Sequence, residues 1–340
     1  MPRGGPKPAL AAPRPRGLSS DVSAEQVVTA SCPTCGTAEL QQLRTHGDAP
    51  QYTLNQCMHC GLQHWSPRVA PGASYYEDEG QALYAAMHAG FRRAEDDPRF
   101  ARFLSELPER GVSSLLDVGC SDGTLLSAAA ARGVAGVGID IDRRSLSVAR
   151  GRGLEVHEAK LADFASTLAA GRTFDRVTMF DVLEHLTEPR SALLAAIGLL
   201  APGGLLVGTV PNRERIFVNL VRTDFPPHHF IRFDRRSLGE MLRSVGATPL
   251  QIDVFQWGYA GPTLLDATVK RTRALMRRGS PGAIATRGGE AGVATPPAVP
   301  IRRRLSHVAA STVAAASARI ERAVGRGFKL YFVAGRNAAP

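Results

Sequence analysis

Short apolar runs alternate with amphipathic stretches through the middle of the chain. Runs with the length and composition of buried strands occupy 114–118, 135–139, 154–157, 174–180 and 204–210. A helical pattern lies between each successive pair of these runs, at 125–131, 145–150, 164–170 and 189–200. Strands and helices that alternate at this rhythm predict an α/β domain with a parallel sheet covered by helices on both faces.

The pattern is less regular on either side of this core. Apolar positions spaced as one helical face predict a helix over 81–107, a brace or lid in front of the sheet. After the core we expect a loop at 210–212, a helix at 234–244, a sixth strand at 250–257 and a closing strand at 328–334. The Gly, Ala and Pro content of 279–300 favours a flexible insertion, and 301–324 has a basic helical pattern.

Four of the five cysteines form two pairs, Cys32-x-x-Cys35 and Cys57-x-x-Cys60. Two such pairs can close a tetrahedral thiolate shell around zinc, and a segment too small for its own core gains folding energy from the metal. We therefore predict a structural zinc site resembling a zinc ribbon, in preference to a redox or disulfide role. His59 and His64 lie close by in the sequence and are expected to be ordinary surface residues.

These features divide the chain into six parts. We expect a disordered leader (1–27), a zinc-binding module (28–70), a helical connector or lid (71–110), an α/β core (111–257), a flexible and helical basic insertion (258–327), and a closing strand with a tail (328–340).

The formal net charge of +10 raises the question of a nucleic-acid partner. Basic residues far outnumber acidic ones from 265 to 340, whereas the two nearly balance from 28 to 264. The basic region is either a solvated helical surface or a site of attraction to phosphate-bearing or membrane-associated substrates, including peripheral membrane contact. Nucleic acid is disfavoured as a partner. With neither a secretory leader nor a transmembrane run evident, we expect a cytoplasmic protein.

The loop after the first strand, 117–123, reads DVGCSDG. Its spacing breaks the G-x-G-x-x-G pattern of dinucleotide sites, so a pyrophosphate ligand is disfavoured. An acid, Asp117, followed by the tight bend Gly119-x-Ser121-x-Gly123 suits a ligand with a cationic amino group and a sulfonium, S-adenosylmethionine. Asp140 ends the second strand, where a carboxylate can accept both ribose hydroxyl hydrogens.

Here the sequence resembles the class I S-adenosylmethionine-dependent methyltransferases, from about 113 to 246. The segments that carry the likeness are 116–120 (LDVGC), 138–140 (GID) and 200–204 (LAPGG). The resemblance implies a Rossmann-like, seven-stranded, mostly parallel sheet. It also implies that Ile141, Asp163 and Phe164 lie along the cofactor, the last two at its adenine. Ser121 replaces the family's usual glycine, which affects how closely the backbone there approaches the methionyl part, and a serine is tolerated at this position if its φ is negative.

The segment 180–186 (FDVLEHL) resembles the border of the methyl-transfer centre in small-molecule O-methyltransferases. Asp181, Glu184 and His185 share one helical face and have the D-x-x-E-H spacing that resembles a divalent-metal set in ubiquinone-pathway O-methyltransferases. The alternative, which we favour, is that these residues order the helix start and the cofactor side of the pocket, with Asp181 beside the cofactor.

The segment 225–230 (FPPHHF) lies between the fifth strand and the next helix, where this fold admits acceptors. Two prolines hold His228 and His229 at the expected pocket rim, and either suits removal of a hydroxyl proton near neutral pH. His185 and Asp181 are further catalytic candidates. We therefore expect methyl transfer to a small-molecule acceptor, such as a hydroxyl of a sugar, glycan precursor or natural product. Carbon methylation of a nucleotide sugar and an RNA-modifying activity are the alternatives.

Overall fold

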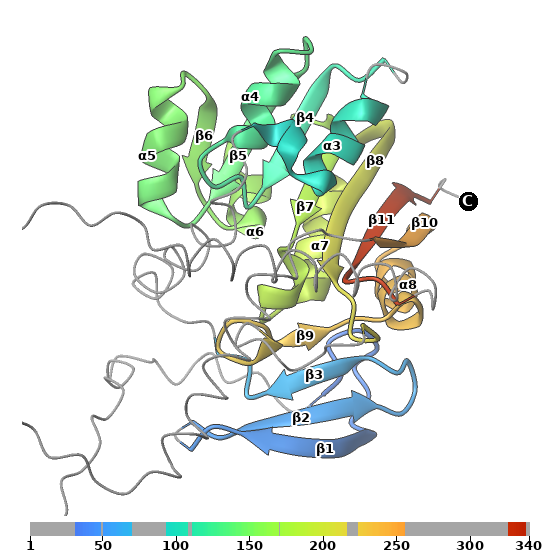
Figure 1. Ribbon diagram of the computed structural model, residues 1–340. Coiled ribbons are helices and arrows are strands. Elements are labelled where there is room, and N and C mark those ends of the chain that lie inside the picture. The colour runs from blue at the N-terminus through green and yellow to red at the C-terminus, as the bar shows by residue number, and fades with distance from the viewer. Residues whose placement is uncertain are drawn as a thin grey trace, which may run out of the picture.

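The computed structural model describes residues 31–48, 50–69, 93–107, 111–169, 171–215, 224–255 and 326–337, which form two β-sheets and the helices around them. Figure 1 shows the larger, helix-covered sheet above and the smaller sheet below it. The small sheet holds the cysteine-rich segment, so the predicted order of a small module followed by an α/β core is present.

The large sheet has seven strands in the order β10-β11-β8-β7-β4-β5-β6. Their bounds are β4 Ser114–Val118, β5 Ala135–Asp140, β6 Glu155–Glu158, β7 Phe174–Phe180, β8 Leu200–Pro211, β10 Ala247–Phe255 and β11 Lys329–Arg336. The five strands β8, β7, β4, β5 and β6 are parallel neighbours. β11 runs antiparallel to both β8 and β10. The predicted seven-stranded, mostly parallel sheet is confirmed.

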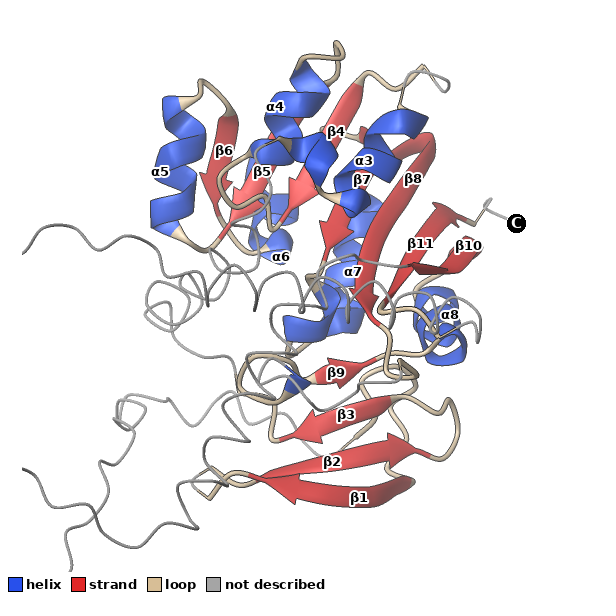
Figure 2. Cartoon of the chain, viewed as in Figure 1, coloured by secondary structure: helices blue, strands red, loops and turns tan. Residues whose placement is uncertain are grey.

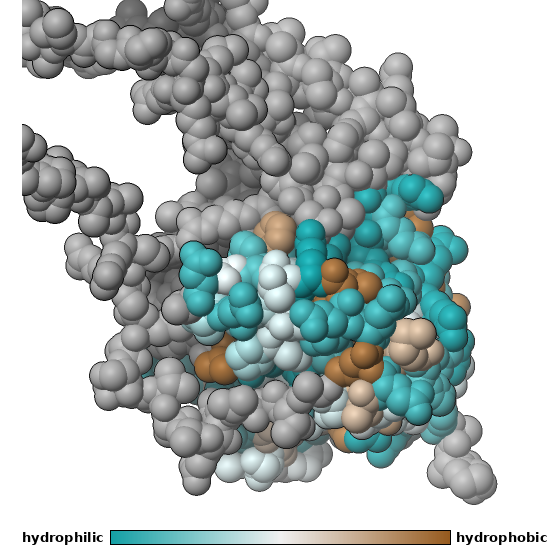
Figure 3. Space-filling model, turned by 90° about the horizontal axis from the view of Figure 1, so that it is seen from below, coloured by the Kyte–Doolittle hydropathy of each residue, from teal (hydrophilic) through white to brown (hydrophobic). Residues whose placement is uncertain are grey.

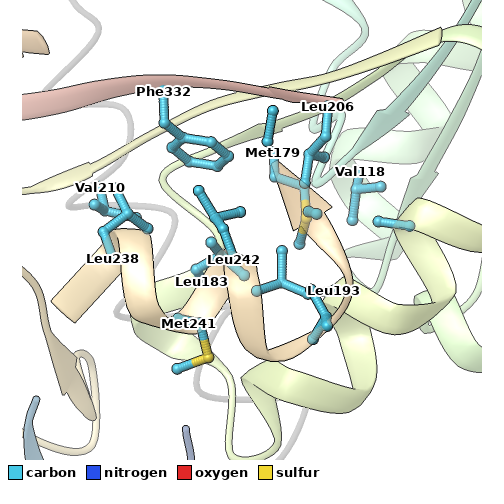
Figure 4. Close-up of a cluster of buried hydrophobic side chains, with 14 of the residues drawn as sticks. Val118, Met179, Leu183, Leu193, Leu206, Val210, Leu238, Met241, Leu242 and Phe332 are labelled. Atoms are coloured by element: carbon cyan, nitrogen blue, oxygen red, sulfur yellow. The ribbon is translucent and has the colours of Figure 1, made fainter. Parts of the chain in front are cut away.

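Helices cover both faces of this sheet (Figure 2). α3 (Pro98–Glu106), α4 (Thr124–Ala130) and α5 (Arg143–Gly151) contribute to one buried cluster, and α6 (Leu161–Asp163), α7 (Pro189–Gly198) and α8 (Arg235–Ser244) to the other. Three short turns, η3 (Ala94–Asp96), η5 (Phe164–Leu168) and η6 (Leu183–His185), connect these elements. Figure 4 shows Leu193 and Leu242 within one such cluster, close to Phe332.

The small sheet has the order β1-β2-β3-β9, with bounds β1 Leu40–His46, β2 Tyr52–Cys57, β3 Gln63–Ser66 and β9 Ile231–Arg232. β9 does not come from the cysteine-rich segment but from the loop after β8. It pairs with β3, and the backbone N–H of Trp65 donates to the Phe230 carbonyl at 2.8 Å. Trp65 is fully buried within the same cluster as the α/β core. The module and the core are therefore continuous in their hydrogen bonding and their packing.

The surface on the side of the small sheet is mostly hydrophilic, with separate hydrophobic side chains (Figure 3). Among the residues that the structure describes, no helix is both long and apolar enough to cross a membrane.

The expected continuous helix over 81–107 is wrong in its described part. Residues 94–96 form η3, and α3 begins only at Pro98, with the Asp97 side chain accepting from the Arg99 N–H as the N-cap. A proline is favoured at the first turn of a helix and disfavours helix in the residue before it, so Asp97-Pro98 separates two elements. Residues 81–92 lie outside the described residues.

Two further expectations need correction. The predicted strand ended at Val210, where the predicted loop began, but β8 continues through Pro211 because β11 supplies a pairing partner from far along the chain, Lys329. His64 was expected at the surface, but its side chain is fully buried, with Nδ1 at 3.2 Å from Nη1 of Arg68. Burial lowers the pKa of His64 to about 4, and the charge of Arg68 adds to this effect. His59 is exposed, as expected.

Several predicted segments lie outside the described residues. They are the leader at 1–27, most of the connector at 71–110, the flexible stretch at 279–300 and the basic helix at 301–324. The closing strand is present as β11, and the predicted sixth strand as β10.

A glycine in β8 allows the close approach of β11. Gly208 pairs with Phe332, and a Cβ at Gly208 would lie 2.3 Å from the Met179 carbonyl oxygen and 2.7 Å from the Phe332 ring. We expect Gly208→Ala to lower the free energy of unfolding by about 2 kcal/mol or more, because overpacking a rigid core is costly. Urea denaturation measures the change.

Gly335→Ala is the matched control within the sheet, because its Cβ would meet only ordinary contacts, the nearest at 3.6 Å. Its effect should stay within about 0.5 kcal/mol. Equal losses in the two variants would contradict the proposed steric role of Gly208.

Candidate functional site

The loop between β4 and α4 turns sharply at the carboxyl end of the sheet. Gly119, Ser121 and Gly123 all have positive φ, at 75°, 49° and 76°. The N–H groups of Gly119 and Cys120 donate to the Ile139 carbonyl at the end of β5, at 2.8 and 3.1 Å. The loop is thereby held against the neighbouring strand, at the edge where parallel sheets bind ligands.

The φ of Ser121 is positive, so the condition under which a serine is easily tolerated is not met. Its left-handed conformation is one that glycine adopts more easily, so the serine at this position carries local backbone strain. The strain is offset by a hydrogen bond, since the Ser121 N–H donates to Oδ2 of Asp140 at 2.8 Å. A Cβ at Gly123 would lie 2.3 Å from Leu154 Cδ1, so a side chain there would displace Leu154 as well as strain the positive φ.

Asp140 therefore joins the first loop to the end of β5. Besides Ser121, the N–H groups of Ile141 and Asp142 donate to its Oδ1 at 2.7 and 2.9 Å. Burial raises the pKa of Asp140, while these backbone donors act in the opposite direction. An ionised carboxylate has about four acceptor positions, so this one keeps capacity for a hydroxyl donor.

Asp117 lies within β4, buried beside Thr178 of β7. The Thr178 hydroxyl donates to its Oδ1 at 2.7 Å. Burial raises the pKa of Asp117 to about 7, the hydrogen bond from Thr178 opposes this shift, and the nearby charge of Asp140 adds to it. The two carboxylates thus act on each other electrostatically, as expected of residues at one strand-end site.

The other predicted cofactor residues differ in exposure. The side chains of Ile141 and Asp163 are exposed, so both are accessible to a ligand. Phe164 is fully buried in the core, with its ring 5.8 Å from that of His157. Its contact with a ligand remains a prediction.

Asp181 follows β7 and has a positive φ of 57°. Its Oδ2 forms ion pairs with Arg99 of α3 and Lys329 of β11, and its Oδ1 accepts from the Thr209 hydroxyl at 2.9 Å. Burial opposes the ionisation of Asp181, but the charges of Lys329 and Arg99 outweigh it and lower the pKa. Asp181 is therefore an ionised carboxylate fully engaged with two cations.

Three imidazoles meet just beyond Asp181. The ring centroid of His185, at the end of η6, lies 4.6 Å from that of His228 and 4.7 Å from that of His229. The rings of His228 and His229 stack on each other, with their centroids 4.7 Å apart. All three residues are catalytic candidates from the sequence, and the structure brings them together. His185 Nδ1 lies 2.6 Å from the His228 carbonyl oxygen, a hydrogen bond in which the ring N–H donates.

Glu184 completes this group, which we call the histidine cluster: Glu184, His185, His228 and His229. Glu184 is 1% exposed, and its Oε1 lies 4.0 Å from Nε2 of both His185 and His229. Burial and the charge of Asp181 raise the pKa of Glu184 well above its usual value. Burial lowers the pKa of His185 and of His229.

The four cysteines of the small sheet also converge. All four Sγ atoms lie within 4.8 Å of one another, and Cys32–Cys60 and Cys35–Cys57 are each separated by 3.5 Å. Both pairs are followed by a glycine of positive φ, Gly36 and Gly61, which closes the turn. These separations suit four thiolates around one ion with metal–sulfur bonds of about 2.3 Å.

Sequence reasoning missed the residues that balance charge around the site. Arg99 and Lys329 are 82 and 148 residues away from Asp181 in the sequence, so no local spacing relates them to it. One signal was available, because Lys329 is a lone charge within the apolar run 328–334. A cation inside a buried strand calls for an acidic partner.

A second group of cations borders the histidine cluster. Arg44 and Arg215 are near Asp224, and Arg215 forms a buried ion pair with it. Burial lowers the pKa of Arg232 to about 10; Asp224 opposes the shift, and the charge of Arg44 adds to it. Arg215 also acts electrostatically on His229, so the arginines and imidazoles lie in one region.

Part of the chain is similar to known methyltransferases. A family model described as a methyltransferase domain matches residues 89–252. The chain is 32% identical over 168 residues to "Ubiquinone biosynthesis O-methyltransferase" of Chromobacterium violaceum, covering 45% of this chain and 72% of that protein. The relative of the same name in Stutzerimonas stutzeri is 33% identical over 124 residues, 35% of this chain. The chain spans about half the length of that second relative, 53%.

A solved structure shares the fold. The plantazolicin methyltransferase BamL, in complex with a triazolic desmethylPZN analog and SAH, is similar with a TM-score of 0.50 and 13% sequence identity. The similarity covers 78% of this chain and 94% of that one.

We expect Lys329→Met to destabilise the protein by about 3 kcal/mol, because it removes one of the two cations that form ion pairs with Asp181. Thermal or urea unfolding measures the change. Adding Asp181→Asn to this variant should recover part of the loss.

Arg143→Met is the control, because its ion pair with Glu158 is exposed and should contribute less than about 1 kcal/mol. If Lys329→Met and Arg143→Met unfold alike, the buried ion pairs do not have the structural role assigned to them.

Proposed function

Because the chain belongs to the class I S-adenosylmethionine-dependent methyltransferases, we propose that it methylates a hydroxyl of a small molecule, such as a sugar, a glycan precursor or a natural product. The observation that carries this proposal is the histidine cluster, which gathers proton-accepting side chains beyond the carboxyl end of β7, next to the strands that bear the cofactor loop. Hydroxyl methylation requires one proton to be removed, and the names of the curated relatives support this class of acceptor.

In this proposal the first loop and Asp140 hold the cofactor. Asp140 accepts the ribose hydroxyls, and Asp117 faces the cationic methionyl part. The turns at Gly119, Ser121 and Gly123 let the backbone approach the ligand. The exposed Ile141 and Asp163 border its adenosine, with Phe164 packed behind them.

The acceptor side rests on positioning and proton removal. Methyl transfer from a sulfonium is an in-line displacement, in which the bond from the acceptor oxygen to the methyl carbon forms as the sulfur–carbon bond breaks. The leaving group is intrinsically good, so the protein must align the two reactants and promote loss of the hydroxyl proton. We assign that task to His185, His228 and His229.

Asp181 has a different role in this proposal. Its ion pairs with Arg99 and Lys329 stabilise the ionised carboxylate and make it a poor proton acceptor, so we assign it a positioning role. Through Arg99 and Lys329 it ties α3 and β11 to the end of β7, between the cofactor loop and the histidine cluster.

The neighbouring arginines favour an acceptor that carries an anionic group. Burial lowers the pKa of Arg232 most, and the charges of Arg44 and Arg215 lower it further, so positive charge gathers in this region beside Asp224. A phosphate or carboxylate on the acceptor would balance it.

We assign a structural zinc ion to Cys32, Cys35, Cys57 and Cys60. The sulfur separations and the two glycine-closed turns support this assignment. Four thiolate ligands leave no open position, so the ion would stabilise the small sheet and take no part in methyl transfer.

Incubation of the purified protein with methyl-labelled cofactor and candidate hydroxyl acceptors tests the proposal. We expect label transfer, and we expect His229→Ala to reduce the turnover number by about a hundredfold, the usual contribution of a group that assists proton removal. Cofactor affinity should be unchanged in that variant and lost in Asp140→Ala. Absence of cofactor binding by the unaltered protein would refute the proposed activity.

Cofactor affinity should also depend on pH through Asp117. A cationic ligand favours the ionised carboxylate, and the pKa of Asp117 is raised to about 7, so binding should strengthen as pH rises from about 6 to 8. Calorimetric titration at several pH values measures this dependence. Asp117→Asn separates it from the ligand's own titration, and identical pH profiles for the two proteins would contradict the role of Asp117.

A further inference from the structure

We propose that the histidine cluster binds one divalent transition-metal ion, distinct from the ion at the four cysteines. The binding site is argued from geometry alone, whereas its part in catalysis rests on the proposed function. The donors come from two segments far apart in the sequence, η6 and the loop that leads to β9.

The spacing of donor atoms suits a single ion. One ring nitrogen from each of His185, His228 and His229 lies within 4.8 Å of the others. Two nitrogens bound to one ion at about 2.1 Å are separated by at most about 4.2 Å, so small side-chain movements close the set.

His185 is already oriented as a ligand. Its Nδ1–H donates to the His228 carbonyl at 2.6 Å, which leaves the lone pair of Nε2 free to bind. Metal-ligating histidines characteristically donate their other ring N–H to a carbonyl or carboxylate, which fixes the tautomer and the direction of the ring.

Glu184 supplies the second, independent observation. Its carboxylate is 1% exposed, and neither oxygen has a hydrogen-bond partner among the residues that the structure describes. Leaving a buried carboxylate without a partner is costly. Oε1 lies 4.0 Å from Nε2 of both His185 and His229, so a cation between these atoms would satisfy the carboxylate and gain a fourth ligand.

Backbone hydrogen bonds hold the two ligand-bearing segments in place. The Phe230 N–H donates to the Glu184 carbonyl at 2.8 Å, and the His229 N–H donates to the Phe225 carbonyl at 3.3 Å. β9 then anchors the same loop on β3. A preformed site of this kind reduces the ordering cost of binding.

This donor set differs from the D-x-x-E-H set considered from the sequence. Asp181 is engaged by Arg99 and Lys329, and two imidazoles from the Pro-Pro-His-His segment stand in its place. Three nitrogens and one carboxylate favour Zn²⁺ or Fe²⁺ over Mg²⁺, which prefers oxygen ligands and octahedral geometry.

An acceptor hydroxyl could join such an ion at a remaining coordination position. Coordination lowers the pKa of a bound hydroxyl, whose proton then passes to solvent as the oxygen takes the methyl group. The imidazoles would thus promote proton loss through the ion that they hold.

Metal analysis of the full-length chain, freed of any affinity tag, tests the site. After apo-protein is loaded with Zn²⁺ and desalted, we expect two zinc ions per chain in the unaltered protein and one in His229→Gln and in Glu184→Gln. Cobalt(II) titration should add a class of sites without thiolate character in its optical spectrum, and Mg²⁺ should not compete for it. His157→Gln, which alters a histidine outside the cluster, is the matched control and should retain two ions.

Circular dichroism and cofactor affinity show whether each variant is folded. One ion per chain in the unaltered protein, or an unchanged second ion in both cluster variants, would overturn the proposed site. These readouts need no acceptor, so they separate the two proposals. Two ions without methyl transfer would retain the site and reject the function, whereas methyl transfer with one ion would retain the function and reject the site.

Discussion

The balance of charge around one partly buried carboxylate, that of Asp181, holds together the elements that surround the candidate site. Asp181 lies at the carboxyl end of β7, where an unpaired charge would be prohibitively costly. The balancing cations come from α3, before the sheet, and from β11, after it. The requirement for charge balance therefore brings both flanks of the core to the region of the β4–α4 loop and the histidine cluster.

The small sheet in turn fixes the position of the histidines on the proposed acceptor side. β9 belongs in sequence to the loop after β8, yet it completes the cysteine-rich sheet by pairing with β3. His228 and His229 directly precede β9, so their positions depend on that sheet. The module is thus a support for the proposed acceptor site, and its own small size is offset by burial of Trp65 against the core.

The sequence predicted the parts of the fold that local pattern determines. The strand at Phe174–Phe180 is as predicted, and Asp140 and the first loop meet as their motif implied, because strand ends in a parallel sheet share one edge. The left-handed Ser121 was not predictable from residue preferences, since its cost is offset by Asp140. The ion pairs of Arg99 and Lys329 were not predicted, because their partner, Asp181, is distant in sequence. The burial of His64 was not predicted either, because it depends on the pairing of β3 with β9, a strand that no sequence pattern indicated.

The strand order also bears on how the polypeptide assembles during synthesis. β10 contacts the rest of the large sheet through β11, which leaves the ribosome only after residues 256–328 have been made. Until then the outer edge of β8 has no partner, and the carboxylate at the end of β7 lacks one of its two cations. The large sheet is therefore complete only after β11 has been synthesised, although β4 to β8 are made much earlier. A product that terminates before β11 would expose the unpaired edge of β8, and such edges promote aggregation.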